Sequence, residues 1–336
     1  MAKVSVLGAG SFGVALAVLL SKNGHRVTIR STSPEKAERL RQERSIPTLE
    51  EVILPEEVEV TADLEYACRG RDLIVLAPAS VYIRSLARSM SPFVEEGQLL
   101  VNVAKGIEAD SLKLLSEQIE EEIPQAEVAV LSGPSHAEEV GRGIPTTCVV
   151  GAHSRRVAET VQNIFMCDSF RVYTNPDIRG IELGGALKNV IALAAGIADG
   201  LGYGDNTKAA LITRGMAEMS RLFAAMGART ETLYGLAGIG DLVVTCASMH
   251  SRNRRAGILI GQGLSMKEAM EEVNMVVEGV YAAGAGRELA RRYGVTMPII
   301  EQVCEVLFAG KAPAEAMREL MLRDRCVENP RLCWEE

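Results

Sequence analysis

The sequence has 336 residues, of which 47% are hydrophobic and 24% are charged, and its formal net charge is −8. This length predicts two domains, and the hydrophobic content is sufficient for a core in each of them. The acidic balance and the low aromatic content of 4% argue against nucleic-acid binding, because the short basic cluster at 252–255 is too local to follow a polyanion.

The cysteines lie at positions 68, 148, 167, 246, 304, 326 and 333 and are never spaced as CxxC. This scatter indicates neither a disulfide framework nor a zinc site, so we expect reduced thiols and no metal. The first apolar run has the pattern of a strand rather than of a signal peptide, and no stretch approaches about 18 uninterrupted apolar residues. We therefore expect a cytoplasmic protein without membrane insertion.

The first predicted element is an apolar strand in KVSVLGAGSFG (3–13), which leads into Gly8-x-Gly10-x-x-Gly13 and then into a helix over 14–22. In this fingerprint Gly8 permits a tight turn, Gly10 lets the backbone approach a pyrophosphate, and Gly13 lets helix and strand pack closely. The phosphates would meet the positive end of the helix dipole. Because a second strand follows, the pattern indicates a dinucleotide site, and an ordinary glycine-rich turn is the alternative.

The second predicted strand, HRVTIR (25–30), ends without the acidic residue that accepts the ribose 2′-hydroxyl in NAD-specific folds. Arg30, Ser31, Thr32 and Ser33 occupy this position instead. A guanidinium and hydroxyl groups suit a 2′-phosphate, so we expect NADPH to be accepted as well as or in place of NADH, with Arg30 and Thr32 near that phosphate. Alternatively, Arg30 extends into solvent at the strand end.

Further strands are predicted over 72–78, 98–104 and 126–133, with helical stretches between several of them. The alternation predicts an α/β domain with a doubly wound, largely parallel sheet of the Rossmann type. Ligands bind at the carboxyl ends of such strands, and three loops lie there. The loop 78–80 could lie along the cofactor, Lys105 places an ammonium above the sheet edge, and Ser135 with Glu138 forms a capping box after Gly133. The alternatives are a solvated charge for Lys105 and a simple helix cap for Ser135.

Beyond 172–180 the sequence changes to long Ala-, Leu- and Met-rich segments with helical spacing. This change predicts a second domain that is entirely helical. We place the boundary at the turn-favouring pair Asn175-Pro176, which gives a dinucleotide-binding domain over 1–175 and a substrate-binding and catalytic domain over 176–336.

The helical half begins with GGALKN (184–189), the predicted start of a helix in which Gly184, Lys188 and Ala192 share one face. A glycine costs a helix about 1 kcal/mol, so this pair indicates that another group approaches closely. Lys188 would be a cation on an apolar surface, where desolvation lowers the pKa of an ammonium toward the range useful for proton transfer. The alternative is a lysine whose ammonium reaches solvent.

A second polar constellation comprises Asp241, Thr245 and the run SRNRR (251–255). Ser251 has the position of an N-cap, which puts Arg252 and Asn253 in the first helical turn, where backbone N–H groups favour anions. The composition predicts a phosphate pocket, with a solvated basic turn as the alternative.

Taken in order, the glycine clasp, Lys105, GPS, GGALKN, GIGDLVVTC, SRNRR and VVEG (276–279) closely resemble the bacterial NAD(P)-dependent glycerol-3-phosphate dehydrogenases over nearly the whole chain. The resemblance implies reversible reduction of dihydroxyacetone phosphate to sn-glycerol 3-phosphate for glycerophospholipid synthesis. It implies that Lys188 is the proton donor and acceptor, with Lys105 and Asp241 beside it. A developing alkoxide needs such an ammonium, and a remote phosphate handle helps to position the carbonyl.

The resemblance also implies two sets of binding residues. Those for the phosphorylated substrate are Lys105, Gly133, Ser135, Lys188, Asp241, Ser251, Arg252 and Asn253. Those for the cofactor, from the fingerprint, the second strand and the family together, are Gly8, Gly10, Ser11, Phe12, Gly13, Arg30, Thr32, Lys105, Ala137, Arg252, Val276 and Glu278.

Two positions depart from the family pattern. Many relatives have Trp and a basic residue where this chain has Arg30 and Thr32. At His136 we expect an apolar residue in this family, so the histidine is interpreted as an incidental residue of the capping turn rather than a catalyst. The rival enzyme class is a hydroxyacid or phosphogluconate-type dehydrogenase, which shares the clasp and a catalytic lysine. A nucleotide-binding sensor is the rival outside enzymes, although a sensor has no need of a proton donor. The sequence allows a homodimer without fixing the oligomeric state.

Overall fold

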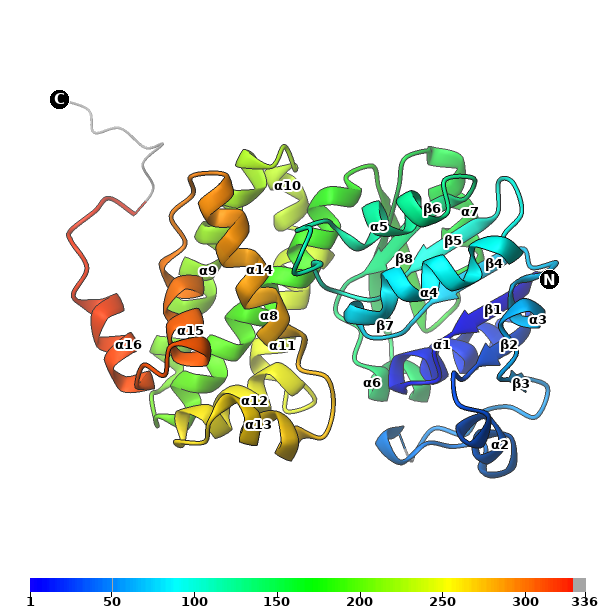
Figure 1. Ribbon diagram of the computed structural model, residues 1–336, viewed down its shortest axis with the longest axis horizontal. Coiled ribbons are helices and arrows are strands. Elements are labelled where there is room, and N and C mark those ends of the chain that lie inside the picture. Colours follow the sequence, from blue (N-terminus) through cyan, green and yellow to red (C-terminus); the bar gives the residue numbers. More distant parts are fainter. Residues whose placement is uncertain (50, 329–336) are drawn as a thin grey trace.

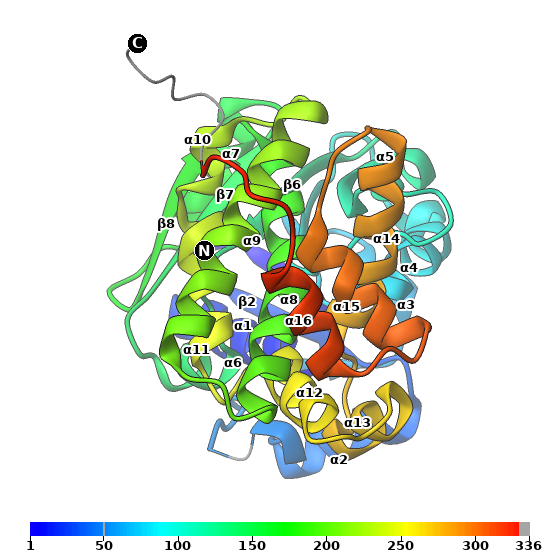
Figure 2. The same cartoon turned by 90° about the vertical axis from the view of Figure 1, so that its left-hand side faces the viewer.

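The computed structural model describes residues 1–49 and 51–328, so Cys333 lies outside the described residues. The chain forms two halves that lie side by side along the long axis, a sheet flanked by helices and a bundle of helices (Figure 1). Viewed from the helical side, α9, α15 and α16 stand in front of the sheet half (Figure 2).

The sheet has eight strands in the order β3-β2-β1-β4-β5-β6-β7-β8. All neighbours pair in parallel except β6 and β7, which are antiparallel. The predicted doubly wound, largely parallel sheet is therefore confirmed, and all the predicted strands are present. The strands are β1 (Lys3–Leu7), β2 (Arg26–Arg30), β3 (Glu59–Thr61), β4 (Leu73–Leu76), β5 (Leu99–Asn102), β6 (Glu127–Ser132), β7 (Thr146–Ala152) and β8 (Phe170–Asn175).

Helices cover both faces of the sheet, and alternate residues of a strand enter the two apolar cores between them. One face carries α1 (Ser11–Lys22), α2 (Pro34–Glu43), α6 (Ala137–Arg142) and α7 (Arg155–Phe165). The other carries α3 (Leu64–Cys68), α4 (Ile83–Met90) and α5 (Leu115–Glu122). Because both faces are covered, the central strands are largely apolar, which is why they were recognisable in the sequence.

The second half is helical, as predicted, and its core is separate from those of the sheet half. Its helices are α8 (Ile178–Gly200), α9 (Asp205–Ala225), α10 (Thr230–Leu233), α11 (Asp241–Ala247), α12 (Arg252–Gly261), α13 (Met266–Val273), α14 (Glu278–Arg292), α15 (Pro298–Phe308) and α16 (Pro313–Met321). A kinked turn, Leu236–Gly240, precedes α11, and the backbone angles of Gly238 within it are not helical.

The start predicted for α8 is wrong by six residues, since the helix begins at Ile178 rather than at Gly184. The Asp177 side chain caps it by accepting a hydrogen bond from the Gly180 amide at 3.0 Å. Glycines at 180, 184 and 185 weaken the local helix propensity, but burial among neighbouring elements outweighs that loss. The predicted close approach is present: a Cβ at Gly184 would lie 2.6 Å from the Ala237 carbonyl oxygen.

α8 crosses α12 at very short range. A Cβ at Gly196 would lie 2.2 Å from the Arg254 carbonyl oxygen, and one at Gly257 would lie 2.3 Å from that of Leu193. Of the single helices in the described part of the chain, only α8 is long and apolar enough to cross a membrane, and its most apolar stretch is wholly buried inside the protein. It is therefore the core helix of the bundle.

Candidate active site

A cavity of about 390 Å³ lies between the two halves and is lined by both. Most of the predicted site residues line it: Gly10, Ser11, Phe12, Lys105, Ser135, Ala137, Lys188, Asp241, Ser251, Arg252, Asn253, Val276 and Glu278. Gly8, Gly13, Arg30, Thr32 and Gly133 do not line it. The loop after β4, predicted beside the cofactor, also contributes to its wall.

The glycine clasp has the geometry that its sequence predicts. Gly8 adopts a φ of +129°, where only glycine is unstrained. A Cβ at Gly13 would lie 1.9 Å from the Gly8 carbonyl oxygen, so α1 can begin this close to β1 only with glycine there. Gly10 has open space around it and lines the cavity. Gly10 is the N-cap residue of α1, so the cavity is open at a helix N-terminus, which can hold a phosphate group.

Asp241 pairs with both lysines that the sequence singled out. Lys188 Nζ donates to Asp241 Oδ1 at 2.7 Å, and Lys105 Nζ donates to Asp241 Oδ2 at 2.6 Å. Lys188 also donates to Thr245 Oγ1 at 2.6 Å, and Lys105 donates to the Gly133 carbonyl at 3.0 Å. The side chains of Lys188 and Lys105 are only 6% and 19% exposed, so neither is a solvated surface charge. The alternatives considered for both residues are therefore wrong.

Burial and mutual charge shift the pKa values of Lys188 and Asp241. Burial lowers the pKa of Lys188 to about 8, although the neighbouring Asp241 favours the ammonium form. Burial alone would raise the pKa of Asp241, but the charges of Lys105 and Lys188 outweigh it and hold that pKa below its ordinary value. Two ammonium groups around one carboxylate leave one positive charge in excess at this end of the cavity.

The N-terminus of α12 forms the second polar wall. Ser251 caps the helix by accepting from the Arg254 amide at 3.2 Å, as predicted. The guanidinium of Arg252 makes no hydrogen bond or ion pair with any of the described residues, and burial lowers its pKa. Asn253 donates to Asn189 Oδ1 at 2.9 Å and accepts from the Gly279 amide at 2.8 Å, so it also holds α12 against α8 and α14.

The predicted capping box at Ser135 is wrong. α6 begins at Ala137 with His136 as its N-cap residue, and Ser135 Oγ instead donates to the Gly133 carbonyl at 3.0 Å. The reason is the turn at Gly133, whose φ of +139° brings its carbonyl within reach of both Ser135 and Lys105. Gly133 thus orients two cavity residues without lining the cavity.

His136 lines the cavity opposite His250, with ring centroids 5.8 Å apart. Its Nε2 atom is buried and has no hydrogen-bond partner among the described residues. Burial lowers the pKa of His136, and the charge of Lys188 adds to that effect. The ring is therefore neutral at neutral pH.

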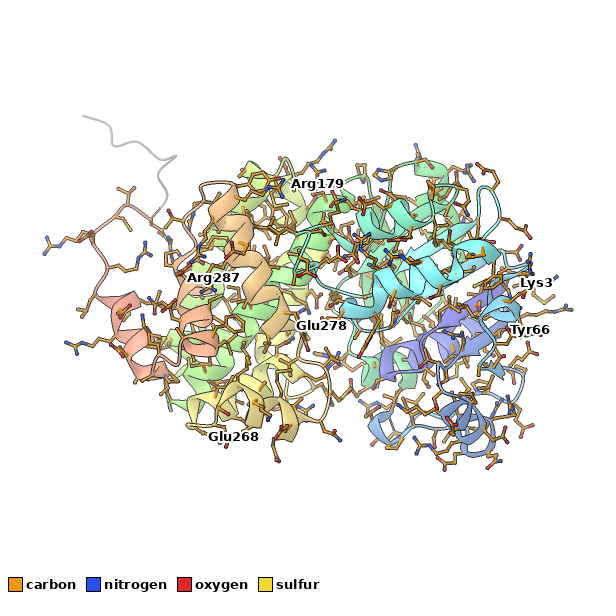
Figure 3. The ribbon with its side chains drawn as sticks, in the orientation of Figure 1. Lys3, Tyr66, Arg179, Glu268, Glu278 and Arg287 are labelled. Carbon is orange, nitrogen blue, oxygen red and sulfur yellow. The ribbon has the colours of Figure 1, made fainter. Side chains whose placement is uncertain are left out.

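Glu278, at the start of α14, lies where the two halves meet (Figure 3). Its carboxylate accepts hydrogen bonds from the Ser80 amide at 2.9 Å and from the Ser80 hydroxyl. A second, buried carboxylate also links the two halves by hydrogen bonds: Glu182 of α8 accepts from the Ser116 amide at 3.0 Å and from the Ser116 hydroxyl.

Several cavity residues escaped the sequence analysis as site residues, namely Asn189, His250 and Met275, and Arg255 was included only as part of the run 251–255, without a role of its own. Thr245 was noted without a role and proves to be a partner of Lys188. The helical spacing of Asp241 and Thr245 was the signal for it, because residues four apart lie on one helix face. Within residues 1–49 and 51–328, no group of three or more His, Cys, Asp or Glu side chains is placed to hold a metal ion.

A doubly wound sheet with this clasp, followed by a helical half that carries a buried lysine at the shared cavity, is the architecture of the two-domain nicotinamide-dependent dehydrogenases. Within that class the chain belongs to the NAD-dependent glycerol-3-phosphate dehydrogenase family. The model of that family's N-terminal part matches residues 3–158, and the model of its C-terminal part matches residues 177–318.

Individual relatives agree. The chain is 58% identical over 331 residues to the glycerol-3-phosphate dehydrogenase [NAD(P)+] of Fusobacterium nucleatum, covering 98% of this chain and 99% of that protein. It is 58% identical over 335 residues to the enzyme of the same name from Agathobacter rectalis, covering 99% and 100%. The crystal structure of glycerol-3-phosphate dehydrogenase from Coxiella burnetii superposes with a TM-score of 0.90 at 35% identity, covering 96% and 99% of the two chains.

Proposed function

We propose that this protein is an NAD(P)H-dependent glycerol-3-phosphate dehydrogenase that reversibly reduces dihydroxyacetone phosphate to sn-glycerol 3-phosphate, with 1–175 binding the dinucleotide and 176–336 binding substrate. The observation that carries the proposal is the pairing of Lys188 and Lys105 with one buried Asp241 at a cavity shared with the dinucleotide clasp. The relatives' names support the substrate. The product would supply glycerophospholipid synthesis in the cytoplasm.

Lys188 is the proton donor in this mechanism. An ammonium has three N–H groups, and two of those on Lys188 are directed to Asp241 and Thr245. The third is available for the substrate carbonyl oxygen, which becomes an alkoxide as the carbon is reduced. Reduced nicotinamide supplies the hydride when it is bound. Lys188 then protonates the oxygen, while Lys105 retains a charge next to Asp241 and keeps the carboxylate paired.

The substrate phosphate binds at the other wall of the cavity. Arg252 offers a guanidinium that makes no direct ion pair with a described carboxylate, although the charges of Glu278 and Glu138 favour its ionised form. Ser251 and Asn253 place it at the N-terminus of α12. Holding the phosphate there fixes the carbonyl near Lys188, so binding energy from a distant group contributes to the rate.

The direct test is to mix the protein with dihydroxyacetone phosphate and follow the absorbance of the reduced nicotinamide, with NADH and NADPH in parallel. We expect decay with at least one cofactor, and the reverse reaction with sn-glycerol 3-phosphate and the oxidised cofactor. A protein that oxidises neither cofactor in the presence of dihydroxyacetone phosphate would contradict the proposal.

The two directions should respond to pH with opposite signs. Reduction requires the ammonium form of Lys188, whose pKa is about 8, so kcat/KM for dihydroxyacetone phosphate should fall as the pH rises through that value. Oxidation requires the neutral amine, so kcat/KM for sn-glycerol 3-phosphate should rise over the same range. Profiles from pH ~6 to ~10 at saturating cofactor measure both. Profiles that show no inflection near that pKa in either direction would show that Lys188 does not carry the proton.

Cofactor choice supplies a further expectation, because β2 ends without an acid. Arg30 does not extend freely into solvent: it is half-buried, and its Nε donates to the Ala62 carbonyl at 3.2 Å. We expect NADPH to be used at least as well as NADH, and Arg30→Glu to weaken NADPH much more than NADH, since the carboxylate would repel a 2′-phosphate. Steady-state KM values for both cofactors test this. A wild-type preference for NADH of tenfold or more, about 1.4 kcal/mol, would contradict it.

A further inference from the structure

The first turns of α12 carry three arginines, and only one of them is neutralised within the described part of the chain. Arg254 Nε and Nη2 both lie 2.8 Å from Asp199 Oδ2, and its Nη1 donates to the Ala247 carbonyl at 2.7 Å. The side chains of Arg252 and Arg255 make no hydrogen bond or ion pair with any residue in 1–49 or 51–328. Arg254 therefore has a structural role, whereas the other two guanidinium groups make no direct ion pair there, and only the more distant charges of Glu278 and Glu138 favour the ionised form of Arg252.

Arg255 faces the same cavity as the dinucleotide clasp. It lines that cavity together with Gly10 and Ser11 of the opposite half. Its side chain is half-buried, and its Nε atom is fully buried without a described partner. Burying an unpaired donor of a charged group costs free energy unless a ligand compensates it. The position of this donor in the cavity wall points to a ligand that is anionic.

Burial is the main cause that lowers the pKa of Arg252, the charges of Glu278 and Glu138 oppose that effect, and the like charge of Arg255 adds to it. Arg252 and Arg255 stand three residues apart, so they share one face of α12 and lie about 4.5 Å apart along its axis. Two guanidinium groups, each with five N–H donors, have enough donors for two phosphate groups. The substrate has only one phosphate, and Arg252 at the helix N-terminus is placed for it.

We propose that Arg255 binds a phosphate of the dinucleotide from across the cleft, as a cofactor contact of the helical half in addition to those that the family resemblance implies for Arg252, Val276 and Glu278. The inference rests on the proposed function only in taking the ligand to be a nicotinamide dinucleotide. Two phosphates of that ligand share the required chemistry: the pyrophosphate, common to NADH and NADPH, and the 2′-phosphate of NADPH. Either one receives charge-assisted hydrogen bonds from a guanidinium.

The test is direct titration of each cofactor by nicotinamide fluorescence without substrate, on wild type, Arg255→Met and Arg255→Lys. We expect Arg255→Met to raise the Kd for NADPH at least fivefold and Arg255→Lys to recover part of the loss. An equal rise for NADH assigns Arg255 to the pyrophosphate, and an unchanged Kd for NADH assigns it to the 2′-phosphate. Arg255→Gln is the second variant if Arg255→Met does not fold.

Arg292→Met is the matched control, because Arg292 is exposed at the end of α14 and its loss changes the net charge equally. Its Kd values should equal those of the wild type. If Arg255→Met binds both cofactors with Kd values within twofold of wild type, the proposal is wrong. The same conclusion holds if only the KM for dihydroxyacetone phosphate rises, because Arg255 would then act on the substrate. A protein that binds dinucleotide but does not reduce dihydroxyacetone phosphate would defeat the proposed function and leave this test valid.

Discussion

Replacing Lys188 by Met is expected to lower kcat for dihydroxyacetone phosphate reduction by a factor of about 10² to 10⁴ or more. Methionine keeps an unbranched apolar stem in a position that is buried among small residues, so packing should survive. The variant loses both the proton donor for the alkoxide and its charge partner. Lys105 does not replace it, because its ammonium is held by the other oxygen of Asp241 and by the Gly133 carbonyl.

Cofactor titration by fluorescence provides the control for Lys188→Met. The Kd should stay near the wild-type value, since the clasp from Gly8 to Gly13 belongs to the other half. Asp241 keeps Lys105 as a partner, so thermal unfolding should show a folded protein. A variant with kcat within threefold of wild type, when chemistry is shown to be rate-limiting, would move the acid–base role to Lys105.

The second large effect is expected for Arg252→Ala. Loss of a charge-assisted bond to the substrate phosphate should reduce kcat/KM by about 2 to 4 kcal/mol, part of which can arise from weaker cofactor binding. The guanidinium has no described protein partner, so its removal breaks no internal ion pair. The measurement is kcat/KM for dihydroxyacetone phosphate in wild type and variant.

Unphosphorylated dihydroxyacetone distinguishes the origin of that loss. It should be a poor substrate for both proteins, and the variant should lose little further activity toward it. Equal losses on the phosphorylated and unphosphorylated substrates would show that Arg252 does not recognise the phosphate.

Local sequence patterns predicted those parts of the fold that a single kind of residue at regular positions can specify. The central strands are continuous apolar runs, and the clasp depends on glycines at fixed spacing. The strands that escaped prediction are different: β3 has only three residues, and β8 is exposed at alternate positions on the sheet edge. β7 runs antiparallel to β6, a pairing that depends on contacts distant in sequence.

In the candidate site, too, the sequence predicted single residues but not the contacts between residues that are distant in the chain. Lys188, Lys105 and Asp241 were each recognisable as buried or loop charges, but the sharing of one carboxylate by two lysines joins residues 136 and 53 positions apart. Ser135 was wrongly predicted to cap α6 because its hydroxyl donates to the Gly133 carbonyl instead. Arg255 could not be separated from Arg254 by sequence, since only the position of Asp199 decides which guanidinium is neutralised.

The continuity of α8 has a mechanical consequence. This 23-residue helix starts against β7, is tied to Ser116 through Glu182, carries Lys188 in its middle, and ends in the crossing with α12. Its first turns are therefore fixed to the sheet half and its last turns to the bundle, so one continuous helix joins the two halves through the position of the ammonium. We therefore expect cofactor exchange to proceed by local opening of short segments such as the Ser80–Glu278 contact, rather than by a hinge that swings the two halves apart.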